Sequence, residues 1–504
     1  AGLGNSDVKR GVGQLLNVSK NGGNNNRNNF GVNLVNCQYD NLRVTAKYAA
    51  GGMVGGLFCN RNEISFDTKD SVRSSVSVTE EAYKTVGKDS SIVINNTNTD
   101  TDTYAGGIFG AVATALYVNV KNLSISDVYQ NTNKTLYTAC LQDITFINSS
   151  DKNNKARYAG GVVGSIQKNN CYVYHIEMKK SDAPDKVISG TIATGGMIGY
   201  ANISGKILEL QNCRAENIKL QDAAGGIGGM IGIVEGDGSG SAEMKITGCI
   251  SQGIHAAGSG DGVSTGGMVG LLRKNQPLTL QACIVLDSTI GSENNKSSYY
   301  GGFAGTITNT PDARLSIFDS ELTNTKINGK YAGGIISAAN GRIYGSNILL
   351  NQVSVAAGGK AGLIVGAKQS DSYNGLYMAG VSVKGNSTAN NVKTQLTGDA
   401  KILEKGYIAL ADYEGTSMTA GNQNPTAGTA GLLGAEGVAP YVVTSPKNSM
   451  SVVDTDGTEK YLFGDSTSWS TDGNTFKLEA QKILEEAGTQ PDGKFVYNAT
   501  GVTL

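Results

Sequence analysis

Histidine, tryptophan and proline are scarce in this chain of 504 residues. It has two histidines, His175 and His255, one tryptophan, Trp469, and seven prolines. With so few histidines, most His-based catalytic centres and most His-ligated metal sites lack the residues they need. The low proline content also excludes a Pro/Gly-rich disordered chain. The composition therefore argues against a typical enzyme.

Charge and long apolar runs are also in short supply. Charged residues make up 17% of the chain, and the formal net charge is −1. This balance removes the electrostatic case for nucleic acid or an anionic membrane as the main partner. The most apolar stretch, Ala223–Val234, is too short and too glycine-rich to span a bilayer, so we expect no membrane insertion. The first residues lack a signal-peptide pattern, and we expect a mature or excised piece of a longer polypeptide rather than a cytosolic protein.

The cysteine pattern fits neither a disulfide framework nor a zinc site. Seven is an odd number, and no two cysteines form a CxxC pair. We therefore expect buried free thiols, which behave as small apolar side chains. The seven are Cys37, Cys59, Cys140, Cys171, Cys213, Cys249 and Cys283.

Glycine, in contrast, is abundant, with 69 residues, and it recurs in a repeated motif. The motif is Gly-Gly-apolar-apolar-Gly, and seven copies are far more than this glycine content gives by chance. Its three glycines are Gly51, Gly52 and Gly55; Gly106, Gly107 and Gly110; Gly160, Gly161 and Gly164; Gly195, Gly196 and Gly199; Gly228, Gly229 and Gly232; Gly266, Gly267 and Gly270; and Gly301, Gly302 and Gly305.

The spacing of the copies indicates a structural repeat. From Gly160 to a degenerate copy at Gly333, successive motifs are 35, 33, 38, 35 and 32 residues apart. The two earlier gaps, of 54 and 55 residues, fit one repeat that carries an insertion of about 20 residues. Shorter relatives of the motif follow at Gly362 and Gly431.

Segments of alternating apolar and polar residues lie between the motifs. Apolar residues recur there with a period of two, which is typical of strands, and turn-forming residues separate the segments. We expect two or three short strands per repeat and no helix. Such a unit cannot bury its apolar face alone, so stacked repeats must share a continuous core. The clearest segments are Leu208–Leu220, Met244–His255, Leu278–Ile290 and Leu315–Ile327.

Stacking explains why glycine recurs in the motif. Each turn of a stacked coil must bend at the same corner, about 4.8 Å from the backbones above and below it. Glycine allows both positive φ and close approach at such a corner. The two apolar residues of each motif are expected on opposite sides of a strand, both covered.

Two further rows follow from the same stacking. Cys213, Cys249 and Cys283 occupy comparable places after their motifs, which predicts an internal row of thiols rather than a redox or metal site. Cys37 lies in similar surroundings. Tyrosines precede several motifs and predict an aromatic row, which is either structural packing or an exposed sugar-binding strip. They are Tyr104, Tyr158 and Tyr331, with Tyr48 and Tyr300 offset by one residue.

The glycine units resemble GLUG-motif repeats, which occur in secreted bacterial surface proteins and in non-catalytic regions of immunoglobulin A peptidases. The resemblance covers about residues 30–366, with a last echo at 431–434. It implies an extracellular, all-β fold: a β-solenoid in the form of a right-handed parallel β-helix, used as a stalk or an adhesive surface. The doubled first glycine and the variable insertions at 67–103 and 124–155 depart from a clean repeat.

The last quarter of the chain differs from the rest. We expect a glycine-motif solenoid at 1–370, a degenerate last repeat and connector at 371–437, and a small mixed α/β module at 438–504 that caps the solenoid or begins another domain. In this module, segments around Met450–Val453 and Lys460–Phe463 flank an Asp-Thr-Asp-Gly turn and predict a hairpin. Phe476–Ala487 predicts an amphipathic helix.

No catalytic motif stands out. The chain lacks His-Glu-x-x-His, a Gly-x-Ser-x-Gly elbow and a Walker loop, so we assign no catalytic or cofactor-binding residue. The one metal hypothesis is calcium, held by Glu235, Asp237 and Asp261 in glycine-rich loops of consecutive repeats. Solvated turns explain these acids equally simply.

The sequence thus predicts a secreted bacterial surface protein with a structural or adhesive role, which presents its solenoid to glycans or host proteins. Two alternatives stay open. One is a carbohydrate-active β-helix enzyme, a polysaccharide lyase or glycoside hydrolase, which needs clustered carboxylates on one face. The other is a phage-type fibre or spike, which would form a stable trimer.

Overall fold

The computed structural model describes residues 11–12, 32–57, 73–78, 84–96, 102–119, 139–146, 156–181, 187–221, 223–236, 243–258, 260–274, 277–292, 298–308, 313–368, 375–385, 387–389, 405–413, 439–444, 450–453 and 459–463. These residues form strands and turns, and none of them belongs to a helix, so none belongs to a helix able to cross a membrane. The chain divides into two compact units, residues 1–272 (unit 1) and 273–504 (unit 2). The domain boundaries expected after residues 370 and 437 fall outside the described residues and stay predictions.

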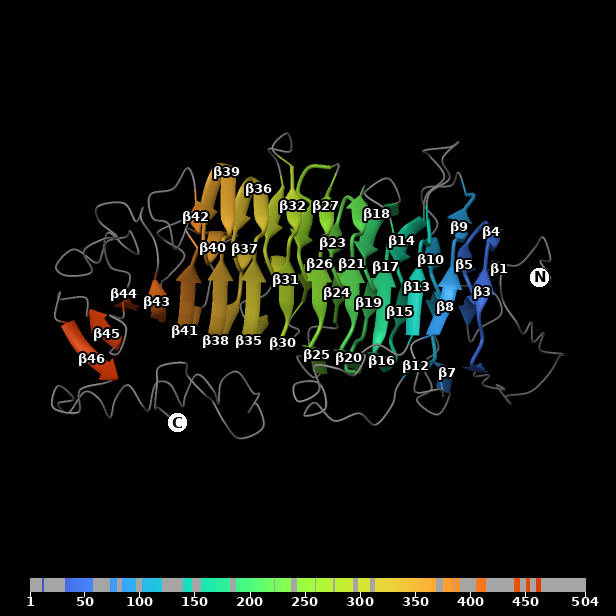
Figure 1. Ribbon diagram of the computed structural model, residues 1–504, viewed down its shortest axis with the longest axis horizontal. Helices are drawn as coiled ribbons and strands as arrows, with labels where there is room; N and C mark the ends of the chain where they lie inside the picture. Colours follow the sequence, from blue (N-terminus) through green and yellow to red (C-terminus); the bar gives the residue numbers. More distant parts are fainter. Residues whose placement is uncertain are drawn as a thin grey trace. The chain divides into compact units, whose positions relative to one another are not determined.

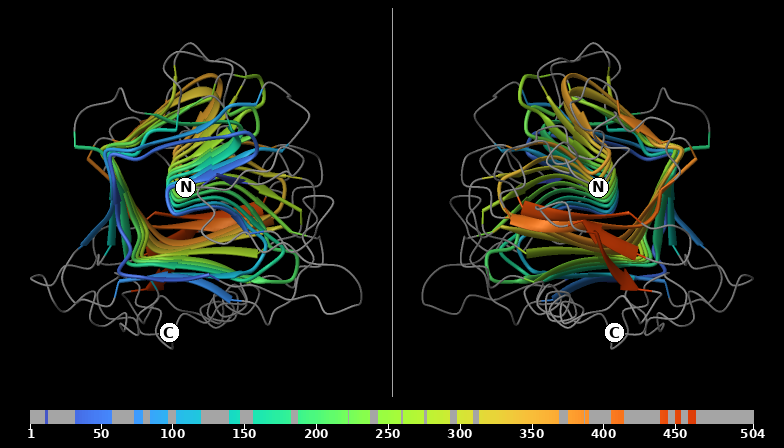
Figure 2. Two further views of the ribbon diagram at one scale, coloured as in Figure 1. Left: turned by 90° about the vertical axis from the view of Figure 1, so that its right-hand side faces the viewer. Right: turned by 90° about the vertical axis from the view of Figure 1, so that its left-hand side faces the viewer.

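Unit 1 is a stack of parallel β coils (Figure 1). A complete turn of the chain adds one strand to each of five ladders, called a to e, and equivalent strands lie one behind another when viewed along the stack (Figure 2). Ladder a holds the strands that end at the first glycine of each motif. They are β1 (Gly11–Val12), β5 (Ala49–Gly51), β10 (Tyr104–Gly106), β14 (Ala156–Gly160), the end of β18 (Val187–Gly195), β23 (Gly226–Gly228) and β28 (Ser264–Gly266).

The chain then passes through the other four ladders in order. Ladder b is β6 (Val54–Leu57), β11 (Phe109–Val112), β15 (Val163–Gln167), β19 (Ile198–Asn202), β24 (Ile231–Glu235) and β29 (Val269–Arg273). Ladder c is β2 (Asn33–Val35), β7 (Arg73–Ser77), β12 (Ala115–Val118), β16 (Cys171–Tyr174), β20 (Ile207–Gln211) and β25 (Glu243–Thr247). Ladder d is β3 (Tyr39–Asp40), β8 (Lys84–Lys88), β13 (Ala139–Gln142), β17 (Ile176–Lys179), β21 (Arg214–Glu216) and β26 (Ile250–Gln252). Ladder e comprises β4 (Arg43–Ala46) with β9 (Ser91–Ile94), and the start of β18 with β22 (Lys219–Gln221) and β27 (His255–Ala257).

Unit 2 repeats this plan with longer strands. Strands of ladders c and d join in β35 (Arg314–Thr323), β38 (Arg342–Asn351) and β41 (Gly375–Lys384), which follow β30 (Pro277–Gln281) and β31 (Ile284–Leu286). Strands of ladders e and a join in β36 (Lys326–Gly333) and β39 (Ser354–Gly362), beside β32 (Thr289–Gly291), β33 (Tyr299–Gly301) and β42 (Thr388–Ala389). Ladder b is β34 (Ala304–Thr308), β37 (Ile336–Ala339) and β40 (Val365–Lys368).

The strand register confirms the repeat that the glycine motif predicts. Gly106 pairs with Gly51 on one side and with Gly160 on the other. The ladder continues through Gly195 and Gly228. The two long sequence gaps are therefore single turns with inserted residues, as their lengths predict. Both units are parallel β-solenoid stacks, in agreement with the expected fold class.

The number of strands per repeat is larger than expected. Each complete turn has five, because the alternating segments bend twice instead of running straight. Asn212 and Asn217 have φ values of 50° and 54°, in the left-handed region, and they interrupt Leu208–Leu220 between β20, β21 and β22. Asparagine tolerates this conformation better than most residues. Single-residue corners of this kind leave the period-two pattern almost intact, so the sequence hides them.

The motif itself forms a sharp corner between ladders a and b. The first glycine ends one strand, the second glycine and the first apolar residue form the bend, and the second apolar residue begins the next strand. The two apolar residues therefore do not point to opposite sides of one strand, as expected. Both are nonetheless buried, as Met230 and Ile231 show, each with 0% exposure.

Close approach, not positive φ, requires these glycines. No motif glycine in the described ranges has a positive φ. A Cβ on Gly195 would lie 1.8 Å from the carbonyl oxygen of Ile198, across the bend. A Cβ on Gly196 would lie 1.9 Å from the carbonyl oxygen of Gly229, one coil further on. A Cβ on Gly199 would meet backbone oxygen of the preceding coil, 2.7 Å from Ala159. Each glycine thus avoids a different backbone collision.

Near the end of the described chain the ladder continues differently. Strand β43 (Lys405–Tyr413) pairs in parallel with β41 and with β44 (Ala439–Thr444). The antiparallel strands β45 (Met450–Val453) and β46 (Glu459–Phe463) follow, which confirms the predicted hairpin. The predicted helix at Phe476–Ala487 lies outside the described residues.

Candidate functional site

The expected calcium ligands do not form a cluster in the described part of the chain. Glu235 ends β24, where its Oε2 accepts a hydrogen bond from the Tyr200 hydroxyl over 3.2 Å. Asp261 lies exposed in a turn, and Asp237 is outside the described residues. No group of three His, Cys, Asp or Glu side chains among the described residues has the geometry to hold a metal ion.

The expected thiol row is present and buried. Cys213 and Cys249 are fully buried at equivalent places in successive coils of unit 1, and Cys283 is fully buried in unit 2. Burial raises the pKa of the Cys249 thiol, and contact with Cys213 raises it further. A neutral thiol is neither a strong nucleophile nor a metal ligand. Cys37 is only half-buried.

The expected tyrosine row also forms, but it is mostly internal packing. The rings of Tyr104 and Tyr158 stack with centroids 5.5 Å apart, and Tyr200 lies 4.8 Å beyond Tyr158. Tyr104 is 1% exposed and packs against Ala49 and Ala111. In unit 2, Tyr299 rather than Tyr300 pairs with Tyr331, and their centroids are 5.1 Å apart.

A second aromatic row, which the sequence reasoning missed, lies on the outer face of ladder c. Tyr117 on β12 and Tyr172 on β16 occupy directly paired positions, and their rings stack with centroids 4.9 Å apart. Their strand neighbours Leu116 and Val118 are fully buried, so Tyr117 lies on the opposite, outer side of the strand. Both tyrosines are partly exposed.

Polar side chains extend this row in both directions. Tyr172 pairs with Glu209, and Glu209 pairs with Lys245 in the next coil. On the other side, Tyr117 pairs with Ser75, whose hydroxyl donates to Asn33 Oδ1 over 2.6 Å. The small serine covers little of the Tyr117 ring.

Tyr174 joins the aromatic row to its carboxylate. Its ring meets Tyr172 edge-on, with centroids 6.3 Å apart. Burial raises the pKa of Tyr174, and the charge of Glu209 and a hydrogen bond to it raise it further. The Tyr174 hydroxyl thus stays protonated and donates to Glu209. We call Tyr117, Tyr172, Tyr174 and Glu209 the tyrosine face.

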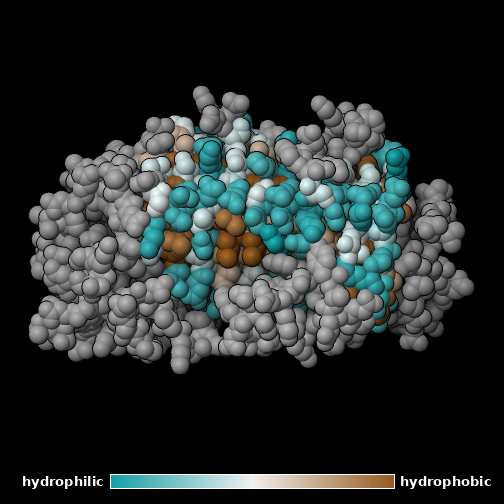
Figure 3. All heavy atoms as spheres, in the orientation of Figure 1, coloured by the Kyte–Doolittle hydropathy of each residue, from teal (hydrophilic) through white to brown (hydrophobic). Residues whose placement is uncertain are grey.

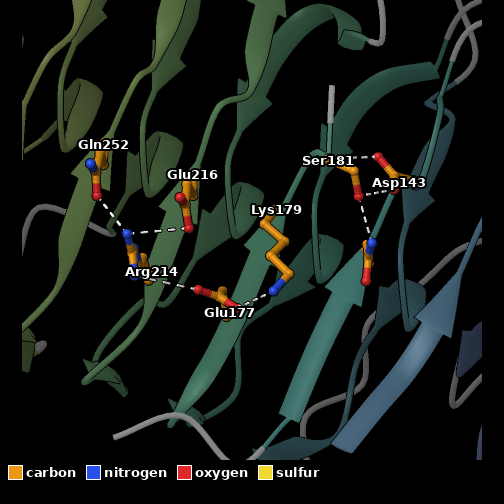
Figure 4. A network of polar contacts seen from close by, with 8 residues as sticks. Asp143, Glu177, Lys179, Ser181, Arg214, Glu216 and Gln252 are labelled. Carbon is orange, nitrogen blue, oxygen red and sulfur yellow. Dashed lines mark hydrogen bonds and ion pairs between the residues drawn. The ribbon is translucent and has the colours of Figure 1, made fainter. Parts of the chain in front are cut away.

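A network of charged residues covers the neighbouring ladder d (Figure 4). Glu177 is 4% exposed, yet its carboxylate lies 3.4 Å from Lys179 Nζ and 3.6 Å from Arg214 Nη1. The other Arg214 nitrogen, Nη2, lies 3.2 Å from Glu216 and donates to Gln252. Nearby, Ser181 binds both carboxylate oxygens of Asp143. These carboxylates are engaged in ion pairs and hydrogen bonds across successive coils.

Surface composition distinguishes the two units on this side. Hydrophilic side chains dominate over β13, β17 and β21 of unit 1 (Figure 3). A hydrophobic patch lies over β31 of unit 2, where Ile284 and Leu286 are half-buried.

Comparison with known proteins assigns no family. No family model matches the chain, and no curated protein and no solved structure matches it significantly. The resemblance to GLUG-motif repeats therefore rests on the glycine units alone.

The tyrosine face had a weak sequence signal. Tyr117 and Tyr172 occupy alternate positions in Ala-Leu-Tyr-Val and Cys-Tyr-Val-Tyr, which are short strand patterns. Their alignment depends on a register that residues 120–138 obscure, because these residues separate the two segments from a regular spacing. Glycine-based alignment alone did not pair them.

Proposed function

We propose that the protein is a secreted bacterial surface protein, a structural or adhesive solenoid whose tyrosine face in unit 1 binds glycans. The stacked coils serve as a rigid scaffold, and no residue is assigned a catalytic role or a cofactor. The observation that supports the proposal is the partly exposed pair Tyr117 and Tyr172 beside Glu209. Cleavage of a polysaccharide by the purified protein would overturn the non-enzymatic part of this proposal.

The chemistry of the face suits a neutral sugar. Tyrosine offers an apolar ring and a polar hydroxyl, which is why it is frequent where one surface must meet both kinds of group. A pyranose has the same two kinds of surface: C–H groups on its faces and hydroxyls around its edge. The ring of Tyr117 beside the small Ser75 provides an apolar contact, while Glu209 accepts hydrogen bonds from sugar hydroxyls.

Rigidity supports the same function. The tyrosines are held by strands paired on both sides, so little side-chain or loop ordering is needed when a ligand binds. Successive coils also repeat at about 4.8 Å, so an extended glycan can contact several turns of unit 1 at once.

The test is a glycan array followed by titration calorimetry with the best neutral ligand. Tyr117→Ala and Tyr172→Ala should each weaken binding at least tenfold, because each removes half of the stacked pair. Tyr331→Ala in unit 2 is the matched control, since it breaks a similar stack with Tyr299 away from the face. Equal affinity for the Tyr172→Ala variant and the unmodified protein would overturn the assignment of this face.

The cellular part of the proposal needs a separate measurement. Fractionation of the source bacterium, followed by immunodetection, should place the chain on the cell surface or in the medium, as part of a longer polypeptide. Detection in the cytosol alone would contradict it.

A further inference from the structure

Two arginines lie side by side on the outer face of unit 2. Arg314 begins β35 and Arg342 begins β38, and the register pairs them directly. Leu315, the neighbour of Arg314, is fully buried, as is Ile343, the neighbour of Arg342. The arginines therefore lie on the side of the sheet away from the core. Both are partly exposed.

The surrounding outer positions carry no acidic residue. The strand pairs flanking the arginines in this row are Pro277 on β30 and Gly375 on β41. The other outer positions of β30 and of the first halves of β35 and β38 are polar or aromatic: Thr279, Gln281, Ser316, Phe318, Tyr344 and Ser346. The row thus brings two positive charges together without a carboxylate at a neighbouring position in the register.

A buried hydroxyl lies in the same group. Ser316 is two residues from Arg314 on the same face of β35, and it pairs with Tyr344 next to Arg342. Ser316 is 1% exposed, and its Oγ has no hydrogen-bond partner among the described residues. A buried hydroxyl without a partner costs free energy, which a ligand oxygen can recover.

The arrangement is unfavourable without a counter-charge. Adjacent strands are about 4.8 Å apart, and like charges at directly opposite positions repel each other. Burial lowers the pKa of the Arg314 guanidinium, and the charge of Arg342 also lowers it, while Tyr344 acts in the opposite direction. An anion between the two guanidinium groups would relieve this repulsion.

We infer that Arg314 and Arg342, with Ser316 beside them, form a binding site for the acidic group of an anionic polysaccharide. Guanidinium groups bind carboxylate and sulfate oxygens through two parallel hydrogen bonds, and two stacked forks can hold one such group from adjacent coils. This site lies in unit 2 and is independent of the tyrosine face of unit 1. Either can fail without the other.

The experiment compares binding of three probes to the full chain at low salt: oligogalacturonate, a neutral galacto-oligosaccharide and sodium sulfate. The test variant is Arg314→Gln/Arg342→Gln. The matched control, Lys326→Gln/Lys360→Gln, also removes two positive charges from unit 2 but from ladders e and a. Oligogalacturonate should bind the unmodified protein and the control with equal affinity, and the test variant at least tenfold more weakly. The neutral oligosaccharide should not compete.

Thermal melting provides a readout that does not depend on binding assays. Oligogalacturonate should raise the melting temperature of the unmodified protein and leave that of the test variant unchanged. Without ligand, the test variant should melt at least as high as the unmodified protein, because it loses a like-charge repulsion. Tighter binding of free sulfate than of oligogalacturonate would overturn the polysaccharide assignment. Equal weakening in the control variant would overturn the site, because net charge alone would then explain binding.

Discussion

The backbone N–H of Cys213 donates a hydrogen bond to the sulfur of Cys249 in the next coil, over 3.4 Å. The Cys213 thiol in turn donates to the carbonyl oxygen of Val173 in the preceding coil, over 3.2 Å. The thiols therefore link three successive turns inside unit 1. They pack as small interior side chains that also take up backbone hydrogen bonds at a corner.

This burial predicts slow thiol chemistry. Cys213, Cys249 and Cys283 should react with iodoacetamide at pH 8 much more slowly than the half-buried Cys37, because attack requires an exposed thiolate. Cys171 should be equally slow, since burial raises its pKa to about 12. Peptide mass spectrometry over a time course gives the rate at each residue. If Cys213 in the native protein is modified as fast as Cys37, it is not an interior residue.

Replacement of the second motif glycine should disrupt the stack. In Gly196→Val the new side chain would collide with the carbonyl oxygen of Gly229, and with the Ala215 methyl group 3.0 Å from the added Cβ. Backbone at such a corner has little room to move, so we expect a loss of about 3 kcal/mol or more in the free energy of unfolding. Thermal and urea unfolding measure it.

Gly358→Val is the matched control for this substitution. A Cβ at Gly358 meets nothing within 4 Å, and its backbone has an ordinary φ. The melting temperature of this variant should stay within about 2 °C of the unmodified protein, which corresponds to a surface substitution of small effect. Equal losses in both variants would show that valine in a strand, rather than the corner, causes the damage.

The fold was predictable because its repeat is written in backbone constraints. Glycines that prevent collisions must recur once per turn, so their spacing revealed the coils and even the two turns with insertions. The corners between ladders c, d and e were not predictable in the same way. They are occupied by Asn212, Gly248 and, in unit 2, Ala282, all with positive φ. A corner that accepts three residue types leaves no single pattern to recognise.

The surface sites were harder to predict than the core. Interior positions repeat because every turn must fill the same space, whereas outer positions vary from coil to coil. Tyr117 and Tyr172 become neighbours only through the register, and so do Arg314 and Arg342, which are 28 residues apart in the sequence. The buried tyrosine row before the glycine motifs was visible because it keeps a fixed distance from them.

Stability should decrease steeply at alkaline pH. Burial raises the pKa of Tyr104, with the charge of Asp102 adding to it, and burial raises the pKa of Tyr39 and that of Cys171, the last to about 12. In the unfolded chain these groups lose protons near pH 10 for tyrosine and pH 9 for cysteine, while the folded state keeps them. The unfolded state then binds fewer protons, so the free energy of unfolding falls as pH rises above about 9, by up to about 1.4 kcal/mol per pH unit for each group.

Urea unfolding between pH 7 and pH 11 measures this dependence. The midpoint should be constant below about pH 8.5 and fall above it, since these groups are protonated in both states at lower pH. Tyr104→Phe keeps the ring stack with Tyr158 but has no hydroxyl to ionise, so its midpoint should fall less steeply. A midpoint independent of pH up to 11 would contradict the burial of these groups.

Arg214 should contribute more to stability than an ordinary surface cation. Its guanidinium contacts Glu177, Glu216 and Gln252 on three successive coils of ladder d, and Glu177 is almost fully buried. Arg214→Met would leave Glu177 with Lys179 as its remaining cation and Glu216 without its ion pair to Arg214. We expect a loss of about 1–3 kcal/mol in the free energy of unfolding, the usual cost of an unsatisfied buried polar group.

Lys88→Met is the control, because Lys88 pairs with Asp89 over 3.4 Å while both side chains are nearly half exposed. Solvent screens such a pair, so its loss should change the free energy of unfolding by no more than about 0.5 kcal/mol. Glu177→Gln combined with Arg214→Met should recover part of the loss, since the uncompensated buried charge is then gone. If Arg214→Met and Lys88→Met have the same small effect, solvent screens Glu177 as well, and the network of ladder d contributes no more than isolated surface pairs do.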